Sequence, residues 1–401
     1  MKILVVCQHY FPEPFRITDI CEELVKRGNE VTVITGTPNY PEGVTYKGYE
    51  KGKKKREVIN GVEVLRVYEI PRKKGILYRF LNYYSFAISS KRLAKKLKGD
   101  YDVIFANQLS PIMMVDGAIA YKKKHNKKLI MYVMDLWPAS LKAGGVKESS
   151  LLYKYYKGVS KRRYTKADVL AVTSRSFISY LKDNFKISED KFIYIPQYAE
   201  SLFSVEACKK EPNEYIDLMF AGNIGKAQSV ESIIKSANEV KENKNIRFHI
   251  VGDGVSLESC KKLADSYALE NVTFYGRRPV EEMPSFYKMA DAMLVTLNSD
   301  EFSKLTLPGK VQSYMASGKP IIASIDGEGQ EIIKEAKCGF VSNAEDYNAL
   351  AENIKAFSLL SKEEIENLSK NSYNYLKENF TKEKFIENLE DLLINYESFN
   401  G

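Results

Sequence analysis

A glycine-containing turn in the second half of the chain combines residue types that bind phosphate. The stretch F-A-G-N-I-G-K-A-Q, residues 220–228, joins an apolar run to a segment with helical spacing. Glycines let backbone N–H groups approach a ligand, and the N-terminus of the following helix attracts negative charge. The candidate binding residues of this turn are Gly222, Asn223, Gly225, Lys226 and Gln228. A purely structural connection between strand and helix explains the same sequence, so both interpretations stay open.

Two further turns follow apolar runs and carry similar chemistry. The candidates are Gly252, Asp253 and Gly254 in V-G-D-G, and Arg277 in G-R-R-P. An arginine at a strand end suits a diphosphate, because its guanidinium group forms paired charge-assisted hydrogen bonds. The alternatives are a tight turn in which Asp253 caps a helix, and a solvated pair of arginines.

A fourth stretch, L-P-G-K-V-Q-S-Y-M-A-S-G-K-P, covers residues 307–320. The pair Pro308 and Gly309 opens a predicted helix, and Gly318 ends it. Lys310 lies in the first turn of this helix, where it could pair with a phosphate or a carboxylate. Gln312 could hydrogen-bond to ligand hydroxyl groups.

Three residues of the first half are candidates for acid–base chemistry. Asp135 follows a predicted strand and could orient or deprotonate a substrate hydroxyl. Glu13 and His9 lie in the loop after the first strand. The alternatives are an aspartate that caps the next turn, a solvated glutamate and a histidine with a structural or substrate-positioning role. His249, inside an apolar strand, is interpreted as a core residue.

These candidates require parallel sheets that hold them at the ends of strands. Alternation of strand and helix patterns predicts an α/β protein of two Rossmann-like, doubly wound parallel-sheet domains. Ligands of such sheets bind at the carboxyl ends of the strands, so both domains are expected to face one cleft. The predicted domains are 1–197, 198–380 and a C-terminal helix, 381–401, that crosses back to the first domain. Polar residues 197–213 form the expected hinge.

Composition excludes several classes of protein. The chain has 401 residues, a net charge of +8 and five scattered cysteines without a C-x-x-C pair. This cysteine pattern argues against a zinc site or a disulfide framework and favours a reducing compartment. The only D-x-D string, Asp100-Tyr101-Asp102, precedes a strand rather than following one, so it is interpreted as solvated surface. No metal site is expected, and no apolar run reaches the ~18 residues of a membrane span.

The excess positive charge concentrates in the first domain and is mixed with aromatic residues. The basic segments are 50–56, 71–86, 91–98 and 161–163. Cations interleaved with aromatic and aliphatic residues suit the interface of an anionic membrane. A merely solvated face is the alternative, and nucleic acid is disfavoured because no recognised binding module accompanies the charge.

The order of the motifs resembles a known family. G-N-I-G, V-G-D-G, F-Y-G-R, E-E-M-P and P-G-K followed by Y-M-A-S-G-K-P are similar to the C-terminal domain of glycosyltransferase family 4, whose fold is GT-B. Y-F-P-E, G-N-E-V-T-V, P-N-Y-P and D-L-W-P in the first half resemble its bacterial capsule and O-antigen branch, notably the N-acetyl-L-fucosamine transferases. The resemblance covers nearly the whole chain.

The resemblance implies a retaining, metal-independent transferase without a cofactor. A UDP-sugar would be the donor, held by the second domain, and an undecaprenyl-diphosphate-linked saccharide would be the acceptor. The donor sugar would be N-acetyl-L-fucosamine or another N-acetylated amino sugar. The enzyme would be cytoplasmic and peripheral on the inner face of the membrane, without a nucleic-acid partner.

The sequence departs from the family pattern at two pairs of positions. The two glutamates that many members carry fall on Leu305 and Ser313, and the usual Arg and Lys fall on Asn223 and Gln228. The resemblance then leaves the phosphate charge to Lys226, Arg277 and Lys310. The missing glutamates keep open an alternative of a different class, a nucleotide-sugar-binding regulatory or scaffold protein with a degraded active site.

Overall fold

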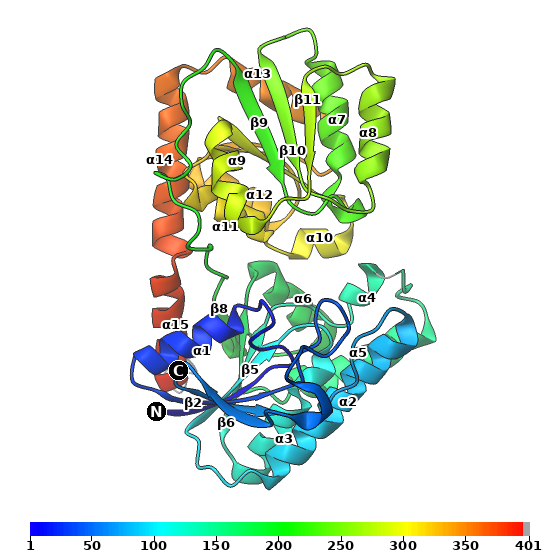
Figure 1. Ribbon diagram of the computed structural model, residues 1–401, viewed down its shortest axis with the longest axis vertical. Coiled ribbons are helices and arrows are strands. Elements are labelled where there is room, and N and C mark those ends of the chain that lie inside the picture. Colours follow the sequence, from blue (N-terminus) through cyan, green and yellow to red (C-terminus); the bar gives the residue numbers. More distant parts are fainter. Residues whose placement is uncertain (144, 396–401) are drawn as a thin grey trace. The chain divides into compact units, whose positions relative to one another are not determined.

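The computed structural model describes residues 1–143 and 145–395. The chain divides into two compact units (Figure 1): Met1–Ile195 with the chain from Ile386 onward, and Pro196–Phe385. Each unit is an α/β domain built on its own sheet. The prediction of two Rossmann-like domains is therefore confirmed.

The first unit contains an eight-stranded sheet in the order β3-β4-β2-β1-β5-β6-β7-β8, parallel except for the β3–β4 pair. Its strands are β1 Lys2–Val6, β2 Glu30–Thr35, β3 Arg56–Ile59, β4 Val62–Arg66, β5 Val103–Gln108, β6 Lys128–Val133, β7 Val169–Val172 and β8 Phe192–Tyr194. Its helices are α1 Ile17–Lys26, α2 Ile76–Lys96, α3 Asp116–His125, α4 Ser140–Ala143, α5 Leu151–Tyr164 and α6 Arg175–Phe185. The end of α15, Lys382–Asn395, also belongs to this unit, where Glu390 accepts hydrogen bonds from Asn29 and Arg27.

Buried strands at the centre of this sheet explain the first βαβ unit. Ile3 to Val6 of β1 are almost completely buried, because the strand has covered faces on both sides. On α1, Ile17, Ile20, Cys21 and Leu24 recur at helical spacing and face the core. The chain order places β1 between β2 and β5, so the loop after β1 starts at the point where the strand order reverses.

The sequence did not predict the β3–β4 hairpin or the helices α2, α4 and α5 of the first unit. The β3–β4 hairpin turns at Asn60-Gly61, whose positive φ values of 48° and 84° are those of a tight hairpin turn. The long helix α2 spans most of the basic segments 71–86 and 91–98, to which no helix or strand was assigned. Its outer face carries apolar as well as basic residues, so the contrast between faces that normally marks a helix is weak.

The second unit contains a fully parallel six-stranded sheet in the order β11-β10-β9-β12-β13-β14. Its strands are β9 Ile216–Ala221, β10 Ile246–Val251, β11 Val272–Gly276, β12 Ala292–Thr296, β13 Ile321–Ser324 and β14 Gly339–Ser342. Its helices are α7 Val230–Glu239, α8 Leu257–Ser266, α9 Met283–Met289, α10 Glu301–Leu305, α11 Gly309–Ala316, α12 Glu328–Ala336, α13 Tyr347–Ser358 and α14 Lys362–Asn379, followed by the start of α15. The strand order reverses between β9 and β12, which is where ligands of such sheets bind.

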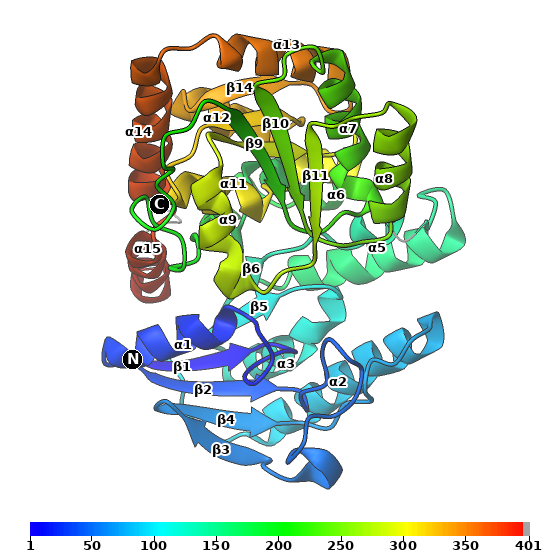
Figure 2. The same ribbon diagram turned by 45° about the horizontal axis from the view of Figure 1, so that its top comes forward.

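Helices cover both faces of this sheet (Figure 2). One core cluster joins the sheet to α7, α8 and α13, with Ile233, Cys260 and Leu350 at its centre. The other joins it to α9, α11, α12 and α14 through residues such as Tyr287 and Tyr314. Because both faces are buried, only the loops at the strand ends are left to bind a ligand.

Candidate functional site

Three loops at the carboxyl ends of β9, β10 and β11 are joined by backbone hydrogen bonds. Gly222 N donates to Val251 O, and Ile224 N donates to Asp253 O, both at 2.9 Å. Gly252 N donates to Gly276 O, also at 2.9 Å. The G-N-I-G, V-G-D-G and G-R-R-P turns therefore form one continuous surface, as expected from three neighbouring parallel strands.

The V-G-D-G glycines are required by the contact between these loops. A Cβ atom on Gly252, whose φ is 145°, would lie 1.8 Å from Gly222 O. A Cβ atom on Gly254 would lie 2.4 Å from Ile224 O. Both distances are far below van der Waals contact, so a side chain at either position would force the loops apart. Asp253 stabilises the same turn by accepting a hydrogen bond from Gly254 N at 2.7 Å.

The joined loops line a pocket of about 470 Å³, within the usual range for small-molecule sites. Its lining residues are Gly222, Asn223, Val251, Gly252, Asp253, Gly254, Arg277, Arg278 and Met283. Six of the predicted binding residues are thus brought together: Gly222, Asn223, Gly252, Asp253, Gly254 and Arg277. Val251 and Met283 were not singled out, because apolar residues carry no distinctive sequence signal.

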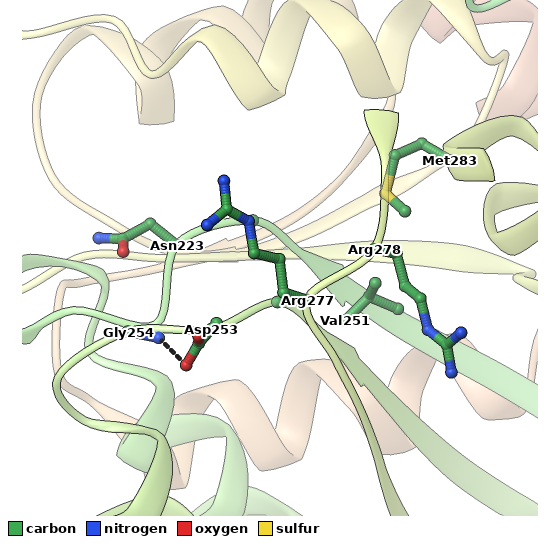
Figure 3. A pocket seen from close by; sticks show the side chains of 9 residues that line it. Asn223, Val251, Asp253, Gly254, Arg277, Arg278 and Met283 are labelled. Atoms are coloured by element: carbon green, nitrogen blue, oxygen red, sulfur yellow. Dashed lines mark hydrogen bonds between the residues drawn. The ribbon is translucent and has the colours of Figure 1, made fainter. Parts of the chain in front are cut away.

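The two neighbouring arginines of this pocket differ in direction and in bonding. Figure 3 shows Arg277 extending toward Asn223, while Arg278 extends to the opposite side. Arg278 Nε donates to Tyr275 O at 3.2 Å, and its guanidinium lies 5.9 Å from the Phe286 ring. Arg277 is exposed and forms no hydrogen bond or ion pair with the described part of the chain. Arg277 is therefore the arginine that is free to bind an anion.

Lys310, on the first turn of α11, lies beside this pocket at the G-N-I-G turn. Its Nζ is 2.9 Å from where a Cβ on Gly222 would be, so only glycine leaves room for the ammonium group. Nζ also lies 3.5 Å from the centre of the Phe220 ring. The Nζ atom is buried and has no hydrogen-bond acceptor within residues 1–143 and 145–395. Burial lowers the pKa of Lys310 to about 7.

A tyrosine on α11 fixes the helix against the end of β9. Tyr314 Oη accepts a hydrogen bond from Ala221 N at 3.1 Å and donates to Ala221 O at 3.2 Å. Lys310 lies one turn earlier on the same face, which directs it to the Gly222 turn. Pro308 forms the N-cap of α11 and lies against Gly329. Tyr314 was not identified from sequence as a positioning residue.

Other predicted binding residues are engaged within the chain or lie apart from the pocket. Gln228 Oε1 accepts hydrogen bonds from Asn223 Nδ2 at 2.9 Å and from Gly225 N at 3.2 Å, so it braces the turn. Gln312 is buried and donates to Gln197 O at 2.6 Å. Lys226 is exposed on the short helical turn Lys226–Gln228 and does not line the pocket.

In the first unit, His9 and Glu13 form a buried pair in the loop after β1. His9 Nδ1 lies 3.0 Å from Glu13 Oε2, and the imidazole stacks on Phe15. Glu13 Oε1 accepts hydrogen bonds from the backbone N–H groups of Asn39 at 2.8 Å and Tyr40 at 2.6 Å. The solvated state considered for Glu13 is wrong, because backbone N–H groups of the 38–41 loop bind Oε1 and His9 lies against Oε2.

A second buried carboxyl group, Glu69, was missed by the sequence analysis. It accepts hydrogen bonds from Asn39 Nδ2 and from Gln8 Nε2, the latter at 3.3 Å. Burial raises its pKa well above the ordinary glutamate value, with the nearby charge of Glu13 as a further cause. Glu69 follows β4, and nothing in its flanking sequence distinguishes it from a surface glutamate.

Asp135 lies after β6 in a separate, partly buried group with Ser110, Ser140 and Trp137. Its carboxylate accepts a hydrogen bond from Ser110 Oγ, which also accepts from Trp137 Nε1 at 2.7 Å. Burial raises the pKa of Asp135, and hydrogen bonds from Ser110 and Ser140 oppose the shift. Asp135 is thus held by side chains of its own domain.

The remaining ionisable candidates are structural. Across the described ranges, no group of three or more His, Cys, Asp and Glu side chains could hold a metal ion. Asp100 is exposed and pairs with Lys127 at 2.8 Å, as expected for solvated surface. His249 is a core residue, as predicted, with Nε2 2.9 Å from Asp217 Oδ1. None of the helices within the described residues is long and apolar enough to cross a bilayer.

Curated relatives of this chain include bacterial and archaeal proteins that are named as glycosyltransferases. A probable glycosyltransferase WbjE of Pseudomonas aeruginosa is 28% identical over 72% of this chain and 74% of its own length. A putative colanic acid biosynthesis glycosyl transferase WcaI of Escherichia coli is 24% identical over 79% and 82%. An uncharacterized glycosyltransferase, MJ1069, of Methanocaldococcus jannaschii is 23% identical over 96% of both chains.

Solved glycosyltransferase structures share the fold over nearly the whole chain. The sucrose-phosphate synthase of Thermosynechococcus elongatus gives a TM-score of 0.76 at 18% identity, covering 99% of both chains. Anabaena HepE, solved in complex with UDP, gives a TM-score of 0.69 at 15% identity over 98% of this chain and 99% of its own. Residues 16–197 match the family described as Glycosyltransferase Family 4, and residues 206–375 match Glycosyl transferases group 1. Together with the two parallel-sheet domains and the pocket at the ends of β9, β10 and β11, these matches place the chain in glycosyltransferase family 4, with a GT-B fold.

Proposed function

We propose that this chain transfers a sugar from a UDP-sugar to a lipid-linked saccharide in the biosynthesis of a capsule or O-antigen polysaccharide. The enzyme acts in the cytoplasm, on the inner face of the membrane, and the acceptor is an undecaprenyl-diphosphate-linked saccharide. WcaI, whose name places it in colanic acid biosynthesis, and HepE, solved with UDP, support this assignment.

The observation that carries the donor assignment is the buried ammonium group of Lys310 beside the Gly222 turn, which has no acceptor among the residues that the structure describes. A buried cation without an acceptor is unfavourable, and a phosphate oxygen at this position would supply the missing partner. Arg277 adds a second cation that has no partner in the described chain. The N-terminus of α11 adds the positive end of a helix dipole.

The proposed reaction is retaining and uses no metal ion. The bond between the sugar C1 and the diphosphate oxygen breaks while the acceptor hydroxyl oxygen bonds to C1 from the same face. The hydroxyl proton passes to an oxygen of the departing diphosphate, so UDP leaves and no dedicated protein base is needed. Lys310, Arg277 and the α11 dipole stabilise the charge that develops on the leaving group.

The acceptor belongs to the first unit in this proposal. Asp135, Glu13 and His9 follow strands at the carboxyl edge of that sheet, where ligands of parallel sheets bind. Because Glu13 is occupied by backbone N–H groups and Asp135 by a hydroxyl, their role is to shape the acceptor site rather than to move protons. The basic and aromatic surface of this unit contacts the anionic membrane that holds the acceptor, and nucleic acid is not a partner.

A panel of nucleotide sugars tests the donor and the class of function. UDP-N-acetyl-L-fucosamine, other UDP-N-acetylamino sugars and GDP-sugars are compared by thermal shift, because a bound ligand stabilises the folded state. UDP release on addition of undecaprenyl-diphosphate-linked saccharides then measures turnover. An N-acetylated UDP-sugar should give the largest rise in melting temperature and should be consumed in the turnover assay. Binding without turnover on any lipid acceptor would favour the alternative, a regulatory or scaffold protein that binds nucleotide sugars, which the missing glutamate pair at Leu305 and Ser313 keeps under test.

A further inference from the structure

The outer face of α5 exposes large apolar side chains at its N-terminal end. Leu151 is 85% exposed, Tyr155 is 57% exposed and Leu152 is also exposed. Leu151 and Leu152 lie in the first turn of the helix and Tyr155 in the second, while Tyr153 and Tyr156 face the core. Exposed leucines at such density are unfavourable in water, so this end of α5 is suited to an apolar partner.

Helix α2 lies beside α5 and extends the same apolar surface (Figure 1). Phe80 stacks on Tyr156 with 6.1 Å between ring centres, and the Tyr84 and Tyr156 hydroxyl groups are 3.2 Å apart. Exposed apolar residues on α2 include Leu77, Tyr78, Leu81 and Ile88. Leu77 and Leu81 each precede a residue of this contact by three positions, so they flank the line along which the two helices meet.

The charge on both helices has a single sign. Aspartate and glutamate make up 52 of the 401 residues of the chain, yet neither α2 nor α5 contains one. Their exposed basic residues are Arg79, Lys91, Arg92, Lys95, Lys96, Lys154, Lys161 and Arg162. The neighbouring acidic residues are already paired, since Glu148 binds Lys142 and Asp116 binds Arg163.

We propose that these exposed residues of α2 and α5, the α2–α5 surface, dock on an anionic lipid bilayer by inserting Leu77, Leu81, Leu151, Leu152 and Tyr155. A bilayer interface accepts apolar side chains among its acyl chains and cations among its headgroups, so it matches both features. A second copy of the chain would bring like charges face to face, and nucleic acid would leave the leucines in water. The purpose of the surface rests on the proposed function, because a lipid-linked acceptor lies at such an interface.

This surface overlaps three of the basic segments that the sequence indicated, 71–86, 91–98 and 161–163, but excludes the fourth, 50–56. The run 51–56 is basic as well, but Arg56 pairs with Glu63 and Lys54 lies 3.9 Å from Glu57. That run therefore has acidic partners and lacks exposed leucines. The bilayer contact is assigned to the two helices and not to the 51–56 loop.

Sedimentation of the full chain with vesicles tests the surface. Vesicles of phosphatidylcholine alone are compared with vesicles that also contain phosphatidylglycerol, and only the anionic vesicles should bind the chain. Leu151→Asp should weaken this binding about tenfold, whereas Leu359→Asp should leave it unchanged. Leu359 is a matched control because it is also 85% exposed but lies at the end of α13 in the other unit. Equal binding of the two variants would overturn the proposal, as would equal binding to neutral vesicles.

Charge reversal provides the second arm. Lys161→Glu with Arg162→Glu should weaken binding to anionic vesicles by at least about thirtyfold, since each lost basic residue contributes about a factor of five near such a surface and each new carboxylate adds repulsion. Lys51→Glu with Lys53→Glu changes the net charge equally and should have a much smaller effect. Fluorescence of Trp137, the single tryptophan, verifies that the first unit stays folded. A dimer that Leu151→Asp dissociates, or RNA binding that depends on Lys161 and Arg162 without vesicle binding, would overturn the proposal.

UDP-sugar binding, measured without vesicles, separates this proposal from the proposed function. The α2–α5 surface variants should bind the donor like the unaltered chain. If they bind vesicles normally while Lys310→Ala abolishes donor binding, the surface assignment falls and the donor site stands. If vesicle binding follows the prediction while no UDP-sugar binds, the donor assignment falls and the surface stands.

Discussion

The candidate ionisable residues of the two domains are bonded in opposite ways. In the first unit, Glu13 accepts two backbone hydrogen bonds and contacts His9, and the Asp135 carboxylate is held by Ser110. In the second unit, Lys310 has a buried Nζ without an acceptor in the described chain, and Arg277 points over the pocket without a partner. A buried group whose hydrogen-bond partners lie within the protein stabilises the fold. A cation without such partners is complementary to an anionic ligand. The difference teaches that burial alone does not identify a functional residue.

The largest expected effect is the loss of stability when Glu13 is replaced by alanine. Glu13→Ala leaves two backbone N–H groups and His9 without their acceptor, which should lower the free energy of unfolding of the first unit by about 3 kcal/mol. Trp137 is buried in this unit and is the only tryptophan, so its fluorescence in a urea titration follows this unit. Glu13→Gln retains one acceptor oxygen and should lose about 1 kcal/mol. If Glu13→Ala had the same free energy of unfolding as the unaltered chain, the hydrogen bonds to Glu13 would not stabilise the first unit, and the contrast between the two domains would fail.

Replacing Lys310 should raise stability, the opposite of replacing Glu13, and should weaken donor binding. Lys310→Met removes a buried amine that lacks an acceptor in the described chain, so the second unit should gain about 1 kcal/mol of stability. Affinity for a UDP-sugar should fall about 30-fold, the value of one charge-assisted hydrogen bond of about 2 kcal/mol. Calorimetric titration measures the affinity, and circular dichroism measures the melting.

Lys319 is the matched control for this experiment. It is also buried, but its Nζ donates to Ala290 O at 2.6 Å. Lys319→Met should therefore lower stability and leave UDP-sugar affinity within about twofold. A Lys310→Met variant that loses stability and keeps its affinity would show that Lys310 is structural like Lys319.

The sequence predicted the second unit better than the first, for physical reasons. Glycine turns after apolar strands mark loops at one sheet edge, so Gly222, Gly252 and Arg277 were correctly expected to lie together. The directions of the side chains could not be predicted. Gln312 and Gln228 form hydrogen bonds with backbone groups of the same domain instead of lining the pocket. Lys310 reaches the Gly222 turn only because Tyr314 packs α11 against the end of β9.

In the first unit the decisive contacts join segments far apart in sequence. Glu69 meets Gln8 and Asn39 only after β1, β2 and β4 have assembled, so no local pattern marks it as buried. The helix α2 was hidden because its outer face is not uniformly polar, and that same property makes the α2–α5 surface a candidate for bilayer contact.

A smaller effect is expected from substitution of the two adjacent arginines, which differ in direction and in bonding. Arg277→Ala should weaken UDP-sugar binding about tenfold, because an exposed cation contributes less than a buried one. Arg278→Ala removes the hydrogen bond to Tyr275 O and should change the affinity less than about twofold. Titrations at low and high salt check the assignment, since the Arg277 contribution should shrink with ionic strength. Equal losses of UDP-sugar affinity in the two variants would mean that both arginines contact the ligand, against the assignment to Arg277.

The smallest effect expected is a pH dependence of donor binding. It requires a lysine that, like Lys310, has no acceptor in the described chain until the ligand binds. Burial lowers the pKa of Lys310 to about 7, and a bound diphosphate favours the protonated amine and raises this pKa again. Binding therefore takes up a proton, and affinity should fall about fourfold from pH 6 to pH 7.5 as the free enzyme loses that proton. A UDP-sugar is the proper ligand, because its diphosphate is esterified at both ends and does not titrate in this range. Calorimetry in two buffers of different ionisation enthalpy measures the proton uptake, which Lys310→Met should abolish. A flat profile with no proton uptake would place the diphosphate away from Lys310, and the contrast between the two domains would then rest on Arg277 alone.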